Sequence, residues 1–328
     1  MRAIVCEELG PAQNLVMRDL PEEELGPQAV RVNIAACGVN FPDTLIIEGK
    51  YQVRPTPPFV PGAEMAGVVT QVGAEVEAWK PGDRVMGVFS HGCYAEQMIA
   101  PAQSLIPIPD GMTFEQAAVF PMAYGTSYHA LKQRASLQAG ETVLVLGAAG
   151  GVGLAAVELS RAMGAGRIIA AVGSASKEER VREAGADEVI IYTQSSLKAE
   201  VKRLTGGQGV DVIYDPVGGD VFAEAVSCLA WGGRLLIVGF AAGSIPQLAM
   251  NKLLLKGAAA VGVFWGAFAM REPAANAQNF AELAQLWADG HLRPHIYQRY
   301  SLANVPQALQ ALGERQVQGK LLIEVADV

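Results

Sequence analysis

The sequence predicts a two-domain α/β protein, with a β-rich domain followed by a domain that contains a doubly wound parallel sheet. Two domains are expected because 328 residues, 51% of them hydrophobic, exceed the size of one ordinary domain. Up to about Met122, short alternating runs are separated by Gly and Pro, which is typical of a compact antiparallel, barrel-like domain. From about Gly140, strand-like and helix-like segments alternate, as the crossovers between parallel strands require.

The first half begins with a strand-like segment, "MRAIV", and continues with "AVRVNIAACGV", "MAGVVTQVGAEV", "GDRVMGVF" and "CYAEQMIAP". In the second half, the predicted strands are the apolar segments "TVLVLGA", "RIIAAV", "EVIIY", "VDVIYDPV" and "RLLIVGF", with "AAAVGVFW" at the edge of the sheet. Between them, helices are predicted from Gly151, from Lys177, near 197–204 and from Val221.

The last part of the chain is too short to fold alone. It holds one amphipathic helix, "NAQNFAELAQLWADG", and one strand, "GKLLIEVA". We therefore expect it to complete the first domain. The expected domains are residues 1–122 completed by 267–328, and residues 123–266.

Composition limits the classes of partner. Lys plus Arg number 25 and Asp plus Glu 33, and no basic run carries interleaved aromatics, so no nucleic-acid partner is predicted. No export signal is visible, and the apolar runs at 143–157 and 257–270 are too short and too rich in glycine to cross a bilayer, so no membrane partner is expected. The cysteines are scattered without a CxxC pair, which indicates reduced thiols and a cytoplasmic location; they are Cys6, Cys37, Cys93 and Cys228.

The segment "VLVLGAAGGVGLAAVELSRAMGA", residues 143–165, has the pattern of a strand, a tight turn and a helix N-terminus. In the dinucleotide fingerprint G-x-G-x-x-G, the glycines allow the turn, the approach of a pyrophosphate and close helix packing. Ala148, Gly150 and Gly153 fill these places, with Gly151 and Val152 between them, and the first departs from glycine. The alternative is a glycine-rich turn that serves packing alone.

The second predicted strand indicates which dinucleotide is bound. NAD-binding proteins place an acidic residue about 20 positions after the turn, where it binds the ribose 2′-hydroxyl. This chain has "IIAAVGSASKEER" there: Gly173 and Ser174 leave room, Ser176 can donate a hydrogen bond, and Lys177 and Arg180 can face a 2′-phosphate. NADPH is therefore the expected cofactor. Alternatively, Lys177 and Arg180 belong to a solvated helix start.

The sequence resembles the medium-chain dehydrogenase/reductase superfamily, and within it the zinc-free quinone oxidoreductase branch. The matching stretches include "ACGVNFPDTLIIEGKY", "PFVPGAEMAGVV", "ETVLVLGAAGGVG", "GADEVIIY", "GVDVIYDPVGGDVFAEAVSCLAWGGRLLIVGFAAG" and "GKLLIEV", so the match runs nearly end to end. The segments "CLAWGGRLLIVGFAAG" and "LLLKGAAAVGVFWG" look most like the quinone-oxidoreductase-like group. The resemblance implies a GroES-like first domain, an inserted Rossmann domain, and a cleft between them that holds NADPH.

Zinc-dependent relatives need a Cys and a His at two positions that hold Asn40 and Ala63 in this chain, so no metal site is expected. Cys37, three residues before Asn40, is interpreted as a buried small residue. His291 and His295 are four residues apart, but Pro294 between them argues against a helix that would bring both to one face.

The resemblance assigns the remaining site residues. The pocket residues of the branch fall on Asn40, Asp43 and Tyr51, and Thr126 matches the position beside the nicotinamide. Lys177 and Tyr192 match contacts of the adenosine phosphate, and Gly239 and Phe240 follow the fifth strand of the Rossmann sheet. Alternatively, Asn40 and Asp43 form a turn at "NFPD", and Tyr51 is an ordinary half-buried aromatic residue. His129, in "TSYHAL", is interpreted as a residue that packs a helix.

Without a metal to polarise a carbonyl oxygen, substrates that delocalise charge by themselves are expected. The predicted function is an NADPH-dependent reductase that transfers a hydride to quinones or other conjugated carbonyls, such as 2-enals and enones. Tyr51 or water then protonates the oxygen, whereas Tyr124 and Tyr128 match the pocket tyrosine less well. Single-electron quinone reduction, reduction of 2-enoyl thioesters, and a non-catalytic NADPH-binding or RNA-binding role remain alternatives.

The segment "AAAVGVFWGAF", residues 258–268, has the pattern of a buried strand at the last position of the sheet. Because an edge so apolar is usually covered, we expect a two-fold homodimer that pairs these edges.

Overall fold

A computed structural model describes residues 1–314 and 317–326 and divides the chain into two compact units. Unit 1 comprises Met1–Met122 and Pro294–Val328, and unit 2 comprises Ala123–Arg293. Residues 267–293, expected in the first domain, thus lie in unit 2, and the chain returns to unit 1 after Arg293. The reason is packing of their long helix, from which Asn279 and Glu282 bind Lys132, also in unit 2, at 3.2 and 2.5 Å.

Unit 1 is built on a seven-stranded sheet with the order β14-β15-β3-β4-β5-β7, and β6 pairs with β3. The strand β3 is the longest, and three other strands pair with it in antiparallel fashion. A separate two-stranded sheet pairs β1 with β2. The elements are β1 (Arg2–Val5), η1 (Ala12–Asn14), β2 (Val16–Asp19), β3 (Ala29–Val39), α1 (Phe41–Ile47), β4 (Glu64–Val72), β5 (Arg84–Val88), β6 (Gln97–Pro101), η2 (Ala102–Ser104), β7 (Leu105–Pro107), α2 (Phe114–Ala118), β14 (Ile296–Ser301), η5 (Leu302–Asn304), α11 (Val305–Gly313) and β15 (Lys320–Glu324).

The C-terminal segment completes this sheet. The strand β15 pairs with β3 in antiparallel fashion, from Leu321 opposite Val39 to Glu324 opposite Ala36. The strand β14 lies parallel to β15, and the helix α11 provides the crossover that parallel strands need. The strand predicted in "GKLLIEVA" is therefore confirmed as β15, and the first residue of β15, Lys320, is placed beside the end of β3.

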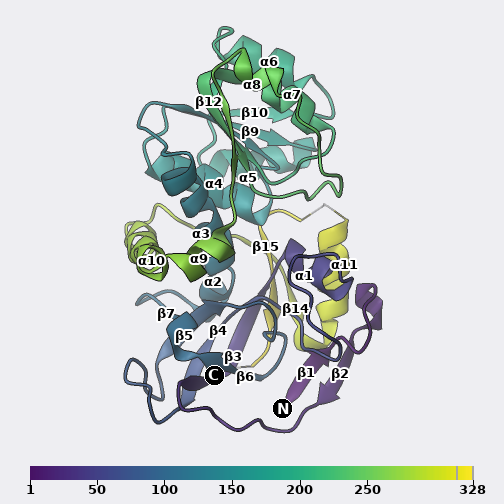
Figure 1. Ribbon diagram of the computed structural model, residues 1–328, viewed down its shortest axis with the longest axis vertical. Helices are drawn as coiled ribbons and strands as arrows, with labels where there is room; N and C mark the ends of the chain where they lie inside the picture. The colour runs from purple at the N-terminus through teal and green to yellow at the C-terminus, as the bar shows by residue number, and fades with distance from the viewer. Residues whose placement is uncertain (315–316, 327–328) are drawn as a thin grey trace. The chain divides into compact units, whose positions relative to one another are not determined.

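Unit 2 contains a six-stranded parallel sheet with the order β10-β9-β8-β11-β12-β13, the doubly wound arrangement predicted from the sequence. Figure 1 shows its strands in the middle of the unit with helices around them. The elements are α3 (Pro121–His129), which starts at the end of unit 1, η3 (Ala130–Arg134), β8 (Thr142–Leu146), α4 (Gly151–Ala162), β9 (Arg167–Val172), η4 (Ala175–Lys177), α5 (Glu178–Glu183), β10 (Glu188–Ile191), α6 (Leu197–Leu204), β11 (Val210–Asp215), α7 (Val221–Ser227), β12 (Leu229–Ile237), α8 (Asn251–Leu254), β13 (Ala259–Gly262), α9 (Trp265–Arg271) and α10 (Pro273–Ala288).

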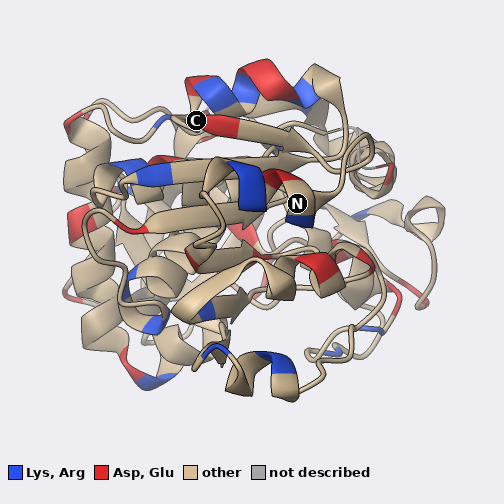
Figure 2. Ribbon diagram, turned by 90° about the horizontal axis from the view of Figure 1, so that it is seen from above, with Lys and Arg blue, Asp and Glu red and all other residues tan. Residues whose placement is uncertain are grey.

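Charged residues of both signs are distributed over the ribbon. In Figure 2, Lys and Arg alternate with Asp and Glu, and neither sign forms a continuous stripe in that view. Within the described part of the chain, no helix combines the length and the apolar character that a membrane span requires.

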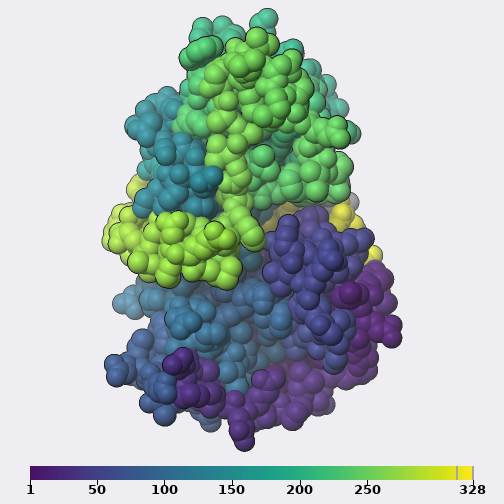
Figure 3. Space-filling model, in the orientation of Figure 1, coloured from purple at the N-terminus to yellow at the C-terminus, as the bar shows by residue number. Residues whose placement is uncertain are grey.

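The edge strand β13 differs from its prediction. It occupies the last position of the sheet, as expected, but it ends at Gly262, and Trp265 begins the helix α9. Its side chains are mostly exposed in the single chain rather than buried, because among the described strands β13 pairs with β12 alone and its other edge is open. Figure 3 shows this green segment uncovered along one face of unit 2.

Candidate active site

The polar residues of unit 1 gather where β3 ends and α1 begins. Asn40 is extended, with φ −127° and ψ 151°, and it precedes the first turn of α1, which contains Pro42. The backbone N–H of Asn40 donates to Oδ2 of Asp43 at 2.8 Å. "NFPD" is therefore the start of a helix and not an isolated turn, because Asn, Pro and Asp suit a helix N-terminus as well as a turn.

Asp43 is buried and has two hydrogen-bond donors on one of its oxygens. Besides the Asn40 N–H, the Tyr94 hydroxyl donates to Oδ2 at 2.8 Å. The other oxygen, Oδ1, is buried and has no hydrogen-bond partner among the described residues. Burial raises the pKa of Asp43 from 3.8 to about 6, although the hydrogen bonds from Tyr94 and Asn40 and the positive charge of Lys320 oppose the increase.

A buried ion pair fixes the side chain of Asn40. Lys320 Nζ donates to Glu64 Oε1 at 2.6 Å, to Asn40 Oδ1 at 2.5 Å and to the Val39 carbonyl at 3.0 Å. The Asn40 amide nitrogen donates to the same Glu64 oxygen at 2.8 Å. Glu64 is fully buried and Lys320 is 6% exposed, so both charges are shielded from solvent. Each charge is compensated by the other, and removal of one partner would leave a buried charge without its counter-charge.

The space around Glu64 is closely filled. A Cβ atom at Gly38 would lie 2.1 Å from Glu64 Oε1, so a residue with a side chain does not fit there without movement. The second carboxylate oxygen of Glu64 accepts the backbone N–H of Met122 at 3.0 Å. Both oxygens of Glu64 are thus bonded, and its position is defined by contacts from the start of α1, from β15 and from the start of α3.

Tyr51 follows α1 and packs, half buried, against the core of unit 1. Burial raises the pKa of its hydroxyl, and the negative charge of Asp43 raises it further. Its hydroxyl makes no hydrogen bond to the described residues, whereas its carbonyl accepts a bond from Arg54. The structure thus brings together all three residues that the resemblance assigned to the unit 1 pocket, Asn40, Asp43 and Tyr51.

The predicted glycine-rich turn in unit 2 connects β8 to α4. Gly147, the residue before the fingerprint, adopts a φ of +57° and makes the turn. A Cβ atom at Gly153 would lie 2.3 Å from the Gly147 carbonyl oxygen, so the third glycine is required for helix packing. At Gly150, by contrast, a Cβ would find its nearest atom at 3.4 Å. Ala148 is buried, and the positive φ of the turn falls on Gly147 and not on Ala148, so the first place of the fingerprint can hold alanine.

The N-terminus of α4 begins at Gly151 and Val152, with Gly150 as its cap residue. Among the described residues, no side chain caps this helix end, so its first backbone N–H groups are available to a ligand. A helix N-terminus with this geometry favours a phosphate group.

The second predicted strand, β9, ends without an acidic residue. The Tyr192 hydroxyl would lie 3.1 Å from a Cβ atom at Gly173, so Tyr192 stands directly over this glycine. Ser174 and Ser176 are joined through their hydroxyl oxygens at 2.9 Å. Lys177 is half buried, and burial lowers its pKa. These residues share one edge of unit 2, at the carboxyl end of β9.

The contacts of Arg180 differ from those of Gly173, Ser174, Ser176 and Lys177. It forms an ion pair with Glu183, one turn further along α5, at 2.6 Å. The alternative interpretation, a charged helix face, therefore describes Arg180 better than a role at the phosphate.

Thr126, Gly239 and Phe240 were also assigned to the cofactor. Thr126 lies on α3, next to Ser127, whose hydroxyl donates to the Val152 carbonyl at the start of α4 at 2.9 Å. Gly239 and Phe240 follow β12, and a Cβ atom at Gly218 would lie 3.0 Å from the Phe240 ring. The loops after β11 and β12 are therefore in contact at the carboxyl edge of the sheet.

A second buried carboxyl group lies on α4. Glu158 Oε2 accepts the Tyr124 hydroxyl at 2.7 Å and the backbone N–H of Arg293 at 3.1 Å. Burial raises the pKa of Glu158 from 4.5 to about 7, in spite of both hydrogen bonds. Tyr124 thus has a structural partner here, and His129 stacks on Phe268 at 4.1 Å between ring centroids, in agreement with helix packing.

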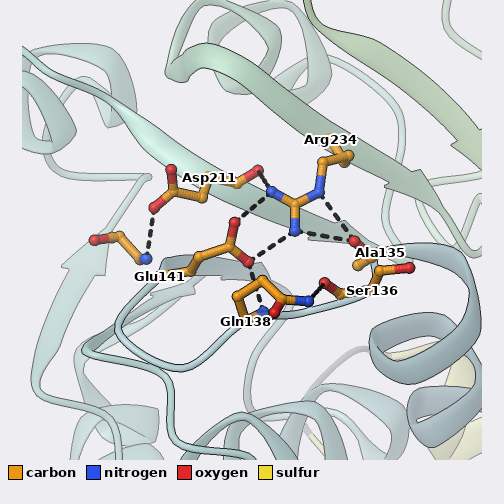
Figure 4. A network of polar contacts seen from close by, with 7 residues as sticks. Ala135, Ser136, Gln138, Glu141, Asp211 and Arg234 are labelled. Atoms are coloured by element: carbon orange, nitrogen blue, oxygen red, sulfur yellow. Dashed lines mark hydrogen bonds and ion pairs between the residues drawn. The ribbon is translucent and has the colours of Figure 1, made fainter.

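A bidentate ion pair lies at the amino end of the Rossmann sheet (Figure 4). Arg234 of β12 binds both oxygens of Glu141 at 2.7 Å and also donates to the Ala135 carbonyl. Glu141 in turn accepts the N–H of Gln138. Burial acts to raise the pKa of Glu141, but the hydrogen bonds from Arg234 and Gln138 and the charge of Arg234 together outweigh it, so the pKa is lowered. The network secures the loop before β8, at the end of the sheet opposite the glycine-rich turn.

Residues 1–314 and 317–326 contain no cluster of three or more His, Cys, Asp or Glu side chains suited to a metal ion. Cys37 is fully buried, as interpreted from the sequence, and its thiol donates to the Cys93 carbonyl. The structure adds four residues that sequence reasoning missed: Glu64, Tyr94, Glu158 and Lys320. Glu64 and Lys320 stand in stretches that carry the resemblance, "PGAE" and "GKLLIEV", and this was their only signal.

The fold and the site define a two-unit dehydrogenase/reductase with a GroES-like unit and a Rossmann unit. Residues 26–110 match the family described as alcohol dehydrogenase GroES-like domain, and residues 151–285 match the family described as zinc-binding dehydrogenase. The chain is 42% identical over 328 residues to the quinone oxidoreductase-like protein 2 homolog of Nematostella vectensis, covering 98% of this chain and 88% of that protein.

Two solved structures are similar over their whole length. The quinone oxidoreductase of Escherichia coli complexed with NADPH is 29% identical, with a TM-score of 0.91 over 99% of this chain and 100% of that one. The mycobacterial protein Rv1454c complexed with NADPH is 32% identical, with a TM-score of 0.92 over 99% and 100%. The chain belongs to the quinone oxidoreductase family of medium-chain dehydrogenases/reductases.

Proposed function

We propose that this protein is a zinc-independent, NADPH-dependent reductase of quinones and other conjugated carbonyls. The observation that carries the proposal is the chemistry of the buried site in unit 1. Asn40, with its amide, stands where zinc-dependent relatives have a metal ligand, and the Tyr51 hydroxyl makes no hydrogen bond to the described residues. Such neutral groups suit substrates whose own conjugation spreads the negative charge.

NADPH fits the residues of unit 2. The turn from Gly147 to Gly153 leaves space at Gly150, and the N-terminus of α4, which no described side chain caps, would hold the pyrophosphate of the cofactor. Gly173 and Ser174 replace the carboxylate that would repel a 2′-phosphate, and Lys177 supplies a positive charge on the same edge of the unit. Tyr192 lies over Gly173, next to the same position. When bound, NADPH supplies a hydride for the electrophilic carbon of the substrate.

The residues of unit 1 bind the substrate oxygen and deliver a proton to it. Asn40 donates a hydrogen bond to this oxygen. Tyr51 remains protonated at neutral pH, because burial and the charge of Asp43 raise its pKa, and it transfers its proton to the oxygen as negative charge develops there. Asp43 holds α1 in place through its bonds to Asn40 and Tyr94, and its charge acts on Tyr51.

The test is a turnover assay with three substrate classes: a quinone, an enone and a 2-enoyl thioester, each with NADPH and with NADH, before and after dialysis against EDTA. We expect NADPH-dependent reduction of the quinone and the enone, unchanged by EDTA. Preference for the thioester would assign the protein to enoyl reduction. NADPH binding without turnover of any class, together with retention of AU-rich RNA in filter binding at physiological salt, would support a binding role instead.

We further propose a homodimer that acts in the cytoplasm. The dimer is supported by the open edge of β13 and by large exposed apolar side chains in the same part of unit 2, among them Trp231, Leu254 and Phe264. The cytoplasmic location is supported by four free, buried cysteine thiols, which suit a reducing compartment.

A further inference from the structure

The hydrogen-bond donors and acceptors around the Asn40 side chain determine which way its amide group is turned. An amide oxygen and an amide nitrogen can exchange places by rotation, so their neighbours decide which is which. Lys320 has only N–H donors and must face the oxygen, which it does at 2.5 Å. The Glu64 carboxylate accepts hydrogen bonds and must face the nitrogen, which lies 2.8 Å from it.

One hydrogen-bond donor of the network formed by Asn40, Glu64 and Lys320 is left for a ligand. Lys320 uses its three N–H bonds on Val39, Asn40 and Glu64. Glu64 is fully buried and accepts bonds on both oxygens. Asn40 uses one of its two amide N–H bonds and is 7% exposed, and its other N–H has no partner among the described residues. This N–H is therefore the only unused donor of the network.

We infer that Glu64 and Lys320 are positioning residues, which hold the Asn40 amide so that it presents an N–H, and never its carbonyl oxygen, to the substrate. This inference rests on the proposed function and adds what fixes the polarity of the site: Glu64 and Lys320 orient the amide so that the group bound at Asn40 is a hydrogen-bond acceptor, a carbonyl oxygen that becomes negatively charged. A donor aimed at such an oxygen typically contributes 10²–10³-fold to turnover.

The test separates the structural role of the network from its orienting role. In Glu64→Gln, the ammonium group of Lys320 loses its buried counter-charge, so the melting temperature should fall. In the double variant Asn40→Asp/Glu64→Gln, the carboxylate moves to position 40, where the Lys320 nitrogen already lies within hydrogen-bond distance, and the net charge of the network is unchanged. This variant should recover the melting temperature, but position 40 then holds only acceptor oxygens.

We expect at least a 30-fold lower kcat for enone reduction in the double variant, with the NADPH dissociation constant within twofold of wild type. Recovery of both stability and turnover, to within threefold of wild type, would show that the pair only supports the fold and would overturn the inference. If the double variant does not fold, we measure Asn40→Ala, which keeps the Lys320–Glu64 pair. Its kcat should also fall at least 30-fold, and a kcat within threefold of wild type would overturn the inference.

A matched control is available in unit 2. Arg234→Met/Glu141→Gln removes another partly buried ion pair, whose contacts lie at the opposite end of the Rossmann sheet from the glycine-rich turn. It should lower the melting temperature and leave kcat within twofold of wild type. A wild-type protein that binds NADPH and reduces no conjugated carbonyl would overturn the proposed function and this inference with it, whereas an active wild type with an active double variant would overturn the inference alone.

Discussion

Glu158→Gln should remove a pH-dependent loss of stability from unit 2. The pKa of Glu158 is raised from 4.5 to about 7 in the folded chain, chiefly by burial. Between these two values the folded state holds a proton that the unfolded state has released, so the wild type loses stability as the pH rises through this window. At about 1.4 kcal/mol for each pKa unit, the difference between 4.5 and about 7 corresponds to about 3 kcal/mol.

Glutamine preserves the contacts at this position without the charge. Its single carbonyl oxygen can accept both the Tyr124 hydroxyl and the Arg293 N–H, which share one oxygen of Glu158. The variant and the wild type should therefore be about equally stable near pH 4.5, and the variant should be more stable by about 3 kcal/mol at pH 8. Urea unfolding followed by circular dichroism at pH 4.5, 6 and 8 measures this difference.

Glu141→Gln provides a control with the opposite sign. Burial acts to raise the pKa of Glu141, but Arg234 and the N–H of Gln138 outweigh it and the pKa is lowered. The contribution of Glu141 to stability is therefore present above the unfolded pKa and is lost as the pH falls. This variant should be less stable than wild type at pH 8, with a smaller difference at low pH. Parallel pH profiles for Glu158→Gln and the wild type would refute the assignment of a buried, proton-holding carboxyl to Glu158.

Three further predictions concern the site and the assembly. Lys177→Ala should weaken NADPH binding by about 1.5–3 kcal/mol, the range for a hydrogen bond to a charged group, and leave NADH nearly unchanged in titration calorimetry; equal losses would place Lys177 on a solvated face. Tyr51→Phe should lower kcat for enone reduction at least tenfold, and less for a quinone, with NADPH binding intact; a change within twofold would make water the proton source. Light scattering at micromolar concentration should give twice the chain mass of 34.6 kDa, whereas a monomer would exclude pairing through β13.

Local patterns predicted the Rossmann unit well. Its central strands are buried on both faces, so they are continuous apolar segments that stand out from the helices between them; Val143 to Leu146 are fully buried. The turn after β8 carries its glycines where backbone and helix meet, and Gly153 shows the expected close contact. The positive φ at Gly147 was missed, because the fingerprint begins one residue later.

Contacts between distant parts of the chain were not predictable in this way. Glu64 and Lys320 are 256 residues apart, and no local pattern indicates that β15 carries Lys320 beside the end of β3. "NFPD" was ambiguous because the same residue types start turns and helices. The sequence predicts a continued strand after Gly262, where the structure has the helix α9 from Trp265, because a short apolar run does not distinguish a strand from a helix.

The most direct test of the central claim is single-turnover reduction of an enone by the purified, EDTA-treated protein loaded with NADPH carrying deuterium at the transferred position of C4. Direct hydride transfer within a complete, metal-independent site predicts that one deuterium appears on the electrophilic carbon of the saturated product. The enolate oxygen is protonated by the protein or by water, and the resulting enol tautomerises to the ketone, so the second hydrogen of the product comes from solvent or protein and is not deuterium. A product without deuterium, or turnover that requires added zinc, would contradict the account.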